Sequence, residues 1–547
     1  MLRIILYSLL TVLLSSSRCD QKISVPEVNT VSPKTDFTWD NATIYFLLTD
    51  RFFNADPEND FQHPVTPAAY RGFMGGDIKG ITAKLKEGYF DSLGVDAIWM
   101  TPLFENITEG VDEGSGFSYG FHGYWIRDWT AFDRRVGTKA DIHEMVSEAR
   151  SRGVRIIFDV VINHTGPVTP TDTQWPDEWV RTGPQCTYKN YKTTIECTLV
   201  KNLPDIRTES TDEVELPTFL IEKWKKEGRY ESEVASLKAF FERTGYPKRP
   251  YYYIVKWLTD MIREFGIDGF RIDTVKHTEE GVWETLWNEA VQAFDDWKKA
   301  NPGQLPDEQE FYMLGEVYGY NAANGRIYDF GDKKVDYFNY GFSSLINFGF
   351  KYEAQKDYEH LFRNYDSLIH GPLNGKSTVH YLSSHDDGAP FDPDRQKSYD
   401  AAIKLLLSPG VAQIYYGDET ARSLNVRASG DAKLRSFMNW DQLNHPDTLA
   451  VLQHWQKIGQ FRRSHPAVGA GRHFKIQDFP YTFSRIYKND KVIVSLNTPK
   501  GKKSIPVNNV FDEGALLRDA YSGMTVKVTG GIAELETAFD LVLLEKL

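Results

Sequence analysis

Four apolar, strand-like runs of the sequence each end in acidic, basic or imidazole side chains. They are residues 156–164, 268–273, 311–316 and 380–386. Parallel strands of a barrel bring their carboxyl ends to one face, where carboxyl groups can serve as nucleophile or general acid. A single strand-terminal Asp is often only a helix cap, and a lone His is usually a satisfied polar group. The four runs together indicate a catalytic pocket.

Two of these carboxyl groups are expected to have distinct roles. Arg271 and Asp273 are two residues apart, so alternation along a strand puts both side chains on one face. An arginine there keeps the carboxylate ionised, which suits a nucleophile. Glu316 ends a mainly apolar strand, where burial raises the pKa of a carboxyl group and suits it to deliver a proton.

The elements that must position these groups alternate along the chain between strand-like and helix-like patterns. Such βα alternation predicts a parallel sheet with helices outside, and about eight strands predict an α/β fold, a closed (β/α)8 TIM barrel. The predicted helices are residues 81–93, 139–152, 251–265, 280–300, 399–407 and 448–463. The predicted strands are residues 43–48, 97–100, 155–162, 269–273, 311–317, 335–342, 378–383 and 411–416.

Changes in composition divide the chain further. The stretch after the third strand is rich in Thr, Pro, Asp and Lys, and it is too long for a loop, so it predicts an inserted domain B. Short alternating runs near the end predict an antiparallel β-domain, a β-sandwich. The expected order is a signal peptide (1–19), a linker (20–38), the barrel (39–164), domain B (165–247), the barrel again (248–465) and the C-terminal β-sandwich (466–547).

Three cysteines and an apolar N-terminal run bear on location. Residues 4–14 follow Arg3 and precede small residues, as in a signal peptide, and no later apolar run approaches a membrane span. Cys19 resembles a lipoprotein cleavage site, although Arg18 replaces the usual small residue. We therefore expect an exported protein that is periplasmic, extracellular or anchored at the cell surface by a lipid on Cys19. Cys186 and Cys197 are expected to form a disulfide; two free thiols are the alternative.

The overall charge excludes some classes of partner. The chain has 63 Lys and Arg against 76 Asp and Glu, a formal charge of −13. It therefore lacks the excess of positive charge that is typical of proteins that bind nucleic acid or anionic lipid. The acidic balance suits divalent cations. Aromatic residues make up 14% of the chain, which is enough for a large core and for surfaces that stack on sugars.

In their order, the four runs resemble the α-amylase family, glycoside hydrolase family thirteen, and more closely its periplasmic bacterial α-amylases. The resemblance covers roughly residues 40–465. Further matching motifs are residues 94–99 with Pro102, residues 121–125 and residues 410–419. Ser384 departs from the pattern, because many members of the family carry Asn before the histidine.

The resemblance implies a role for each matching residue. Asp273 would be the nucleophile, Glu316 the general acid and base, and Asp386 a third carboxylate that orients the sugar hydroxyls and favours the distorted ring. A retaining mechanism follows, through a covalent glycosyl intermediate. The implied substrate-binding residues are His122, Tyr124, His164, Arg271, Lys276, His277 and His385, with Tyr124 stacking on the sugar and Lys276 reaching the reducing-side sugar.

The resemblance also implies calcium, which prefers hard oxygen ligands. One site would use Asn163, Asp205 and the carbonyl of His277; a plain polar interface is the alternative. The second would lie in an N-terminal loop, where an acidic turn without metal is the alternative. Its expected ligands are Asn54, Asp56, Asn59, Asp60, Gly75 and Asp77.

The expected activity is endo-hydrolysis of α-1,4-glucosidic bonds in starch, glycogen and maltodextrins by a monomer. A cyclomaltodextrinase, a neopullulanase or a transglycosylating enzyme remains open, because the competition between water and acceptor sugars is not visible in a sequence. A non-catalytic glycan-binding protein is the alternative from another class. Its signature would be a lost carboxylate, and all three carboxylates are present.

Overall fold

Eight parallel strands close into a barrel in the computed structural model, which describes residues 37–305 and 307–547. Each strand pairs with its neighbour in chain order, and the last pairs with the first, so the predicted TIM barrel is confirmed. The strands are short and buried on both faces. They are β1 (Thr43–Leu47), β2 (Ala97–Met100), β7 (Arg155–Val160), β10 (Gly269–Ile272), β11 (Tyr312–Gly315), β14 (Ser344–Asn347), β15 (Ser377–Tyr381) and β16 (Val411–Tyr415).

Helices between the strands bury one face each against the barrel. Clear end signals bound several of them: Thr138 and Asp141 form a capping box, and Pro250 and Gly266 flank another helix. The longer helices are α2 (Ile78–Lys86), α4 (Lys139–Ser151), α8 (Pro250–Phe265), α9 (Glu280–Ala300), α11 (Tyr358–Ile369), α12 (Ser398–Leu406) and α13 (Pro446–Ser464). Short ones are α1 (Thr49–Phe52), α3 (Tyr89–Ser92), α10 (Phe350–Glu353) and α14 (Ala467–Ala470). The 3₁₀ turns are η1 (Trp39–Asn41), η2 (Pro57–Asn59), η3 (Val275–His277), η4 (Ala322–Asn324), η5 (Tyr337–Tyr340), η6 (Gly430–Leu434) and η7 (Trp440–Gln442).

The sixth strand was predicted at residues 335–342, and this prediction is wrong. The segment contains the end of a small hairpin, β12 (Tyr328–Asp329) with β13 (Lys334–Val335), and then η5. Asp336 accepts a hydrogen bond from the backbone of Phe338 and Gly341 has a φ of +95°, so the chain turns here. The aromatic residues of this segment are typical of a strand, which is why the sequence predicted one here. The barrel strand itself, β14, follows directly after the turn.

Two insertions rise from the barrel. The one after β7 contains β8 (Val180–Arg181), α5 (Lys192–Ile195), β9 (Asp205–Ile206), α6 (Thr218–Lys226) and α7 (Tyr230–Thr244). The predicted Cys186–Cys197 disulfide is formed within it. The insertion after β2, which the sequence did not indicate, contains β3 (Phe104–Asn106), β4 (Val111–Asp112), β5 (Phe117–Ser118) and β6 (Ile126–Phe132).

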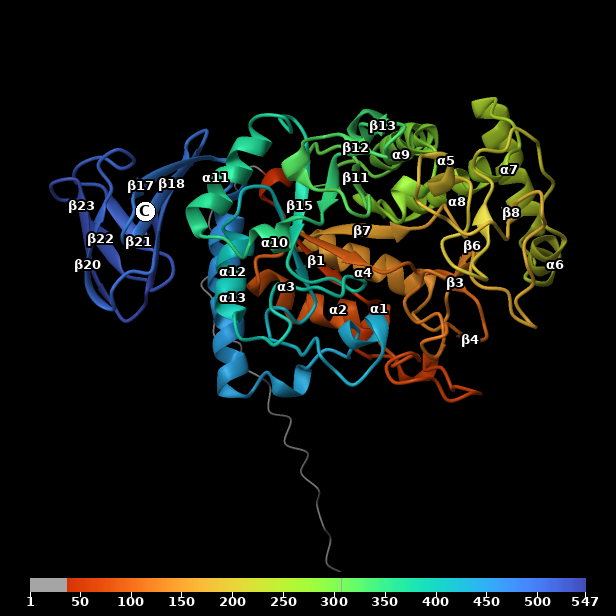
Figure 1. Ribbon diagram of the computed structural model, residues 1–547, viewed down its shortest axis with the longest axis horizontal. Helices are drawn as coiled ribbons and strands as arrows, with labels where there is room; N and C mark the ends of the chain where they lie inside the picture. The colour runs from red at the N-terminus through yellow and green to blue at the C-terminus, as the bar shows by residue number, and fades with distance from the viewer. Residues whose placement is uncertain (1–36, 306) are drawn as a thin grey trace, which may run out of the picture. The chain divides into compact units, whose positions relative to one another are not determined.

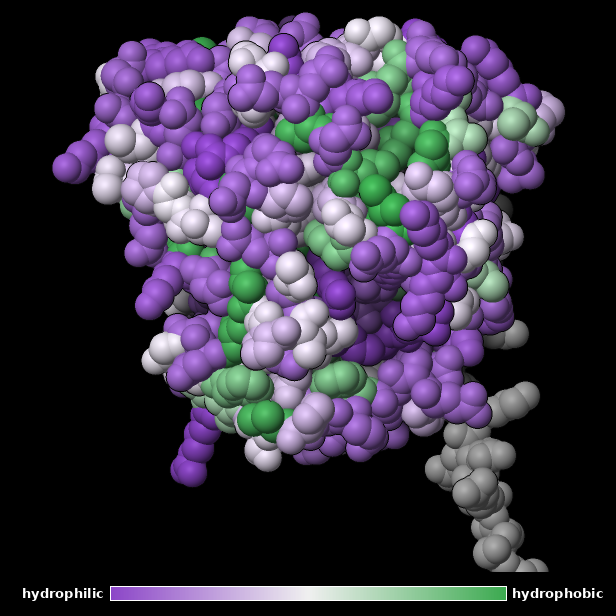
Figure 2. Space-filling view, turned by 90° about the vertical axis from the view of Figure 1, so that its right-hand side faces the viewer, coloured by the Kyte–Doolittle hydropathy of each residue, from purple (hydrophilic) through white to green (hydrophobic). Residues whose placement is uncertain are grey.

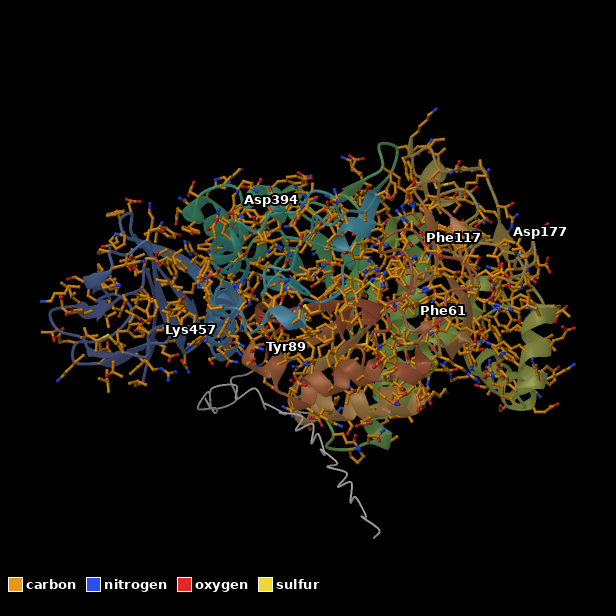
Figure 3. All side chains as sticks on the ribbon, turned by 90° about the horizontal axis from the view of Figure 1, so that it is seen from below. Phe61, Tyr89, Phe117, Asp177, Asp394 and Lys457 are labelled. Atoms are coloured by element: carbon orange, nitrogen blue, oxygen red, sulfur yellow. A yellow bond between two sulfur atoms is a disulfide. The ribbon has the colours of Figure 1, made fainter. Side chains whose placement is uncertain are left out.

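The C-terminal region is antiparallel, as predicted. A six-stranded sheet has the order β17 (Arg472–Gln477), β18 (Tyr481–Tyr487), β19 (Asp490–Leu496), β24 (Leu541–Lys546), β21 (Leu516–Asp519) and β22 (Thr525–Lys527), and β20 (Gly501–Pro506) pairs with β23 (Ile532–Thr537). Both sheets contribute to one small core that includes Ile493, Ile505 and Leu535. Lys457 of α13 contacts the rings of Tyr521 and Phe539, 4.7 and 4.9 Å from their centroids; Figure 3 labels this lysine beside the C-terminal strands.

The predicted signal peptide, Cys19 and most of the predicted linker lie outside the described residues. Within the described ranges, no helix combines the length and apolar character that crossing a bilayer requires.

Candidate active site

The candidate residues gather at the carboxyl ends of the barrel strands. Asp273 directly follows β10, Glu316 follows β11, and Asp386 lies five residues beyond β15. The arrow of β7 in Figure 1 points to the side of the molecule that Figure 2 shows, where mainly hydrophilic residues surround a hollow. Asp273 and Glu316 are buried, at 7% and 5% exposure, whereas the Asp386 side chain remains 29% exposed.

One buried guanidinium contacts three carboxyl groups. Arg271 Nη1 lies 2.9 Å from Oδ1 of Asp159 and 2.9 Å from Oδ1 of Asp273, and its Nη2 lies 3.0 Å from Oε2 of Glu316. Arg271 and Asp159 are register partners on β10 and β7, so strand pairing itself aligns them. Only arginine has a planar fork that can donate to several oxygens at once, and this fork holds the carboxyl groups close to one another.

Glu316 sits where its neutral form is favoured. Burial raises the pKa of its carboxyl group well above the usual value; Arg271 opposes this effect, and the negative charges of Asp273 and Asp386 add to it. The backbone N–H of Thr274 donates to Oε2 over 2.9 Å. Thr274 has a φ of +52°, a strained value for a β-branched residue, so the backbone is held out of its preferred region at the cluster.

Tyr124 and two histidines form an aromatic layer beside the carboxyl groups. The Tyr124 hydroxyl donates to Oδ2 of Asp159 over 2.7 Å, and the ring stacks on His385 and His122, with centroids 5.4 and 5.7 Å apart. Burial lowers the pKa of His122, of His164 and of His385, the last to about 4. These imidazoles are therefore neutral at pH 7 and add no positive charge to the site.

Asp386 has its own set of partners. Ser384 donates a hydrogen bond of 3.2 Å to its Oδ1, so the departure from the family pattern still supplies a hydroxyl contact. Although burial raises the pKa of Asp386, His385, Arg271 and Arg435 outweigh it and hold the pKa below the usual value. Asp386 and Glu316 are thus shifted in opposite directions within one pocket.

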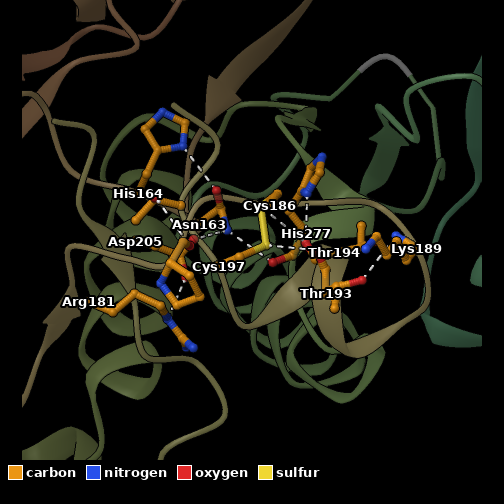
Figure 4. The surroundings of a disulfide bond; sticks show 12 residues. Asn163, His164, Arg181, Cys186, Lys189, Thr193, Thr194, Cys197, Asp205 and His277 are labelled. Atoms are coloured by element: carbon orange, nitrogen blue, oxygen red, sulfur yellow. Dashed lines mark hydrogen bonds and ion pairs between the residues drawn. A yellow bond between two sulfur atoms is a disulfide. The ribbon is translucent and has the colours of Figure 1, made fainter. Parts of the chain in front are cut away.

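Lys276 lies at the edge of the pocket on η3. Its Nζ donates to the carbonyl of Tyr318 over 3.0 Å and to the hydroxyl of Tyr328 over 3.1 Å. Next to it, the ring of His277 contacts the insertion, where its Nδ1 meets the carbonyl of Thr194 at 2.9 Å (Figure 4). The His277 ring therefore supports the insertion, and its backbone carbonyl faces Asn163.

A family model, the alpha amylase catalytic domain, matches residues 46–464, a span that includes every strand bearing the carboxyl cluster. The chain belongs to the alpha-amylase family. Membership makes it a glycoside hydrolase on a TIM barrel.

Alpha-amylase family relatives match over most of the chain. The periplasmic alpha-amylase of Escherichia coli (strain K12) is 35% identical over 530 residues, covering 86% of this chain and 73% of that protein. A cyclomaltodextrin glucanotransferase of Niallia circulans is 24% identical over 480 residues, and the match spans 85% of this chain but only 60% of the transferase. An alpha-amylase structure from Anoxybacillus superposes with a TM-score of 0.67 at 23% identity, covering 93% of this chain and 99% of that chain.

The first set of oxygen groups that the alpha-amylase resemblance linked to calcium does come together. Asn163 Nδ2 lies 2.6 Å from Oδ1 of Asp205 and 3.0 Å from the carbonyl of His277, so these groups converge from three separate segments. Asp205 also pairs with Arg181 at 2.9 Å. An amide, a carboxylate and a backbone carbonyl are groups whose oxygens suit Ca²⁺.

The second set comes together in part. The Oδ1 atoms of Asn54 and Asn59 are buried without a hydrogen-bond partner. A Cβ on Gly75, whose φ is +87°, would lie 2.4 Å from both Asn54 Nδ2 and Asp60 Oδ1, so only glycine leaves room at this convergence. Orphaned oxygens and a crowded glycine fit a cation site.

Two acidic side chains of that loop are occupied elsewhere. Asp77 caps α2 by accepting from Gly80 N and also accepts from the backbone of Ala55 and Asp56, and the Asp56 carboxylate pairs with Lys79 at 2.6 Å. Within residues 37–305 and 307–547, no three His, Cys, Asp or Glu side chains converge into a metal-binding group. Calcium in this loop would thus be held by the Asp60 carboxylate together with amide and backbone carbonyl oxygens.

Sequence reasoning gave no role to Asp159, although this residue lies at the centre of the site. It contacts Arg271, the Tyr124 hydroxyl and the Trp99 indole N–H, which donates over 2.9 Å. The available signal was a charged residue inside the otherwise apolar run 156–162. Sequence reasoning also did not place Tyr188 and Tyr318 beside Lys276, although their ring centroids lie 5.9 and 5.2 Å from its Nζ, because nothing in a sequence brings an insertion and a strand end together.

Proposed function

We propose that the chain is a retaining endo-hydrolase of α-1,4-glucosidic bonds in starch, glycogen and maltodextrins. Asp273 is the nucleophile, Glu316 the general acid and base, and Asp386 the stabiliser of the transition state. The observation that carries this proposal is the shared guanidinium: Arg271 contacts both Asp273 and Glu316 and so keeps the two groups near each other. Retaining glycosidases need their two carboxyl groups about 5 Å apart.

The mechanism follows from the different surroundings of the two groups. Glu316, whose raised pKa favours the protonated form, protonates the leaving glycosidic oxygen while Asp273 attacks the anomeric carbon. Once the leaving chain departs, the Glu316 carboxylate takes a proton from water, which displaces Asp273 and releases the α-anomer. Asp386 orients the hydroxyl groups of the sugar and favours its distorted ring, and the ring of Tyr124 stacks on the sugar.

The substrate class is supported by the printed names of the relatives, an alpha-amylase and a cyclomaltodextrin glucanotransferase. The transferase relatives also favour a second candidate, transglycosylation, in which a sugar hydroxyl replaces water at the glycosyl-enzyme. Hydrolysis is the better-supported outcome because the match to the alpha-amylase is stronger in identity and covers more of the relative's length.

The proposal includes calcium, in the role of a structural ion. Asn163, Asp205 and the His277 carbonyl would hold one ion between the barrel and the insertion, and Asn54, Asn59, Asp60 and Gly75 would hold another. The ions would supply cross-links between distant segments rather than take part in the chemistry.

Export is supported by the disulfide and by the similarity to a protein named periplasmic. Disulfides persist in oxidising compartments, so the periplasm or the cell surface is the expected location. A lipid on Cys19 and a monomeric state remain predictions of the sequence.

The deciding experiment follows the anomers released from maltoheptaose by the wild type and by Asp273→Asn. We expect α-anomeric maltooligosaccharides from the wild type and at least a hundredfold slower release from the variant, because the nucleophile is lost. β-Anomeric products would overturn the retaining mechanism. Longer or cyclic products would make the chain a transferase.

Chelation tests the calcium part separately. If the free calcium concentration is about a hundred times the Kd of each site, removal of calcium lowers the free energy of unfolding by about 2.7 kcal/mol per site. Adding back calcium, but not magnesium, should restore the lost stability. The measurement is the melting temperature with and without EDTA. An unchanged melting temperature would remove both ions from the proposal.

A further inference from the structure

Asp386 is the least firmly held of the three candidate carboxyl groups. Arg271 contacts Asp273 and Glu316 directly. Within the described residues, the Asp386 carboxylate accepts a single hydrogen bond, from Ser384 over 3.2 Å, and its side chain is 29% exposed. The direction in which this carboxylate points must therefore come mainly from the backbone that carries it.

The backbone around Asp386 is a loop that leaves β15 and returns on itself. The Phe391 N–H donates to the carbonyl of Leu382 over 2.8 Å, which closes the loop at its base. On one side of Asp386, the carbonyl of His385 accepts from Arg435 Nε over 2.8 Å, so that neighbour is fixed. The anchor on the other side is built from side chains.

Asp387 supplies this second anchor through a buried charge pair. Its Oδ2 pairs with Nζ of Lys351 and accepts from the Tyr381 hydroxyl over 2.5 Å, and its Oδ1 accepts from the Ala389 N–H over 3.2 Å. Lys351 and Tyr381 are buried, at 3% and 1% exposure. Both carboxylate oxygens of Asp387 are therefore held by groups from three parts of the chain, namely α10, the end of β15 and the loop itself.

The place of this network beside Asp386 indicates a role other than stability. A buried ion pair adds little stability, because removing two charges from water is costly. α10 packs beside β15 (Figure 1), so Lys351 reaches the residue that follows Asp386. Burial raises the pKa of the Tyr381 hydroxyl, and Asp387 raises it further. The charges of Asp386 and Glu316 add to this shift, so the network lies within reach of the candidate carboxyl groups.

We propose that Lys351 and Tyr381 are positioning residues for Asp386, which they hold through Asp387. The inference rests on the proposed glycosidase function and deepens it, because it names what fixes the direction of the third carboxylate. A displacement of about 1 Å is enough to remove much of the benefit of a positioned group. The buried pair limits such a displacement, because it fixes a residue whose Cα lies about 3.8 Å from that of Asp386.

The first test separates activity from stability. It compares Lys351→Met with the triple variant Lys351→Met/Tyr381→Phe/Asp387→Leu, which replaces the network by apolar side chains. We expect kcat on maltoheptaose to fall about 10- to 100-fold in both, with KM changed less than about twofold, because the third carboxylate acts in the transition state. The melting temperature should fall in Lys351→Met, which leaves a buried carboxylate unpaired, and recover in the triple variant. Recovery of kcat together with the melting temperature would overturn the inference, because the network would then serve the fold alone.

A milder variant and a matched control accompany this test. Tyr381→Phe removes only the hydroxyl and should lower kcat about threefold to tenfold, the range of one hydrogen bond, with KM again nearly unchanged. Lys256 is likewise a buried lysine, 2% exposed, and pairs with Asp260 on the outer helix α8. Lys256→Met should lower the melting temperature without lowering kcat. A loss of kcat in this control as large as in Lys351→Met would contradict a specific positioning role.

Asp386→Asn distinguishes a failure of this inference from a failure of the proposed function. The proposed role of Asp386 requires a loss of kcat on maltoheptaose of about a hundredfold or more in this variant. Wild-type kcat in Asp386→Asn would refute that role, and the positioning role with it. An inactive Asp386→Asn together with wild-type kcat in Lys351→Met and in Tyr381→Phe would overturn the positioning role alone.

Discussion

Two charge clusters of this molecule are built differently. At the active site one cation, Arg271, contacts Asp159, Asp273 and Glu316, so negative groups outnumber positive ones. A second cluster, the His465 joint, lies where α13 meets the C-terminal sheet. There His465 meets Asp490 Oδ1 at 2.8 Å and Glu545 Oε2 at 2.6 Å, and Arg518 also pairs with Glu545, so two cations match two carboxylates.

The difference separates a cluster for chemistry from a cluster for stability. In the active site burial raises the pKa of Glu316, and the negative charges of Asp273 and Asp386 add to the effect, which favours the protonated form that a general acid needs. At the joint, burial lowers the pKa of His465, but hydrogen bonds to Asp490 and Glu545 outweigh it and raise the pKa to about 9. Balanced charges hold the imidazolium in place and leave nothing reactive.

The largest expected effect comes from neutralising the active-site cluster with Glu316→Gln. Removing the general acid should lower kcat on maltoheptaose by about 10²- to 10⁴-fold, with substrate binding preserved. Steady-state rates and binding of maltoheptaose to the variant measure the two parts. Glu310→Gln, exposed at the opposite end of β11, is the control; comparable losses in both variants would count against the assigned acid.

Arg271→Lys keeps the charge of the active-site cluster but removes the fork. Arg271 lowers the pKa of Glu316, so loss of the Nη2 contact should raise that pKa further and move the alkaline limb of the pH–rate profile to higher pH. The free energy of unfolding should fall by about 3 kcal/mol, because buried carboxyl groups lose partners.

Urea denaturation and pH–rate profiles measure the two effects of Arg271→Lys. Arg155→Lys, which changes a buried arginine paired with the single carboxylate of Asp307, should cost less. An alkaline limb that stays in place would show that Arg271 does not tune the acid.

The smallest effect is expected at the joint, from His465→Gln. The folded-state pKa is about 9, above the ordinary 6.5, so the contribution to stability is fully present below pH 6.5 and is lost as the pH rises through 9. The variant should be less stable by roughly 2–3 kcal/mol at pH 6 and nearly equal to the wild type at pH 10. Melting curves at both pH values test this, and a pH-independent difference would contradict a charged joint.

The apolar runs of the sequence were enough to predict most of the barrel strands. Apolar runs such as residues 155–160 form barrel strands because a strand buried on both faces must be continuously apolar. Charged residues that end such runs lie at one face of any (β/α)8 barrel, so Asp273 and Glu316 could be located without coordinates. The sixth strand failed because the aromatic segment 335–342 turns at Asp336 and Gly341.

Only the tertiary structure decided which side chains share partners. Asp159 became part of the site because the register of β7 against β10 sets it opposite Arg271, and register depends on neighbours that are distant in sequence. Tyr188 reached Lys276 because a disulfide and a hydrogen bond to His277 direct the insertion back over the barrel. Local sequence fixes which groups a strand end carries, whereas packing between segments fixes what each group meets.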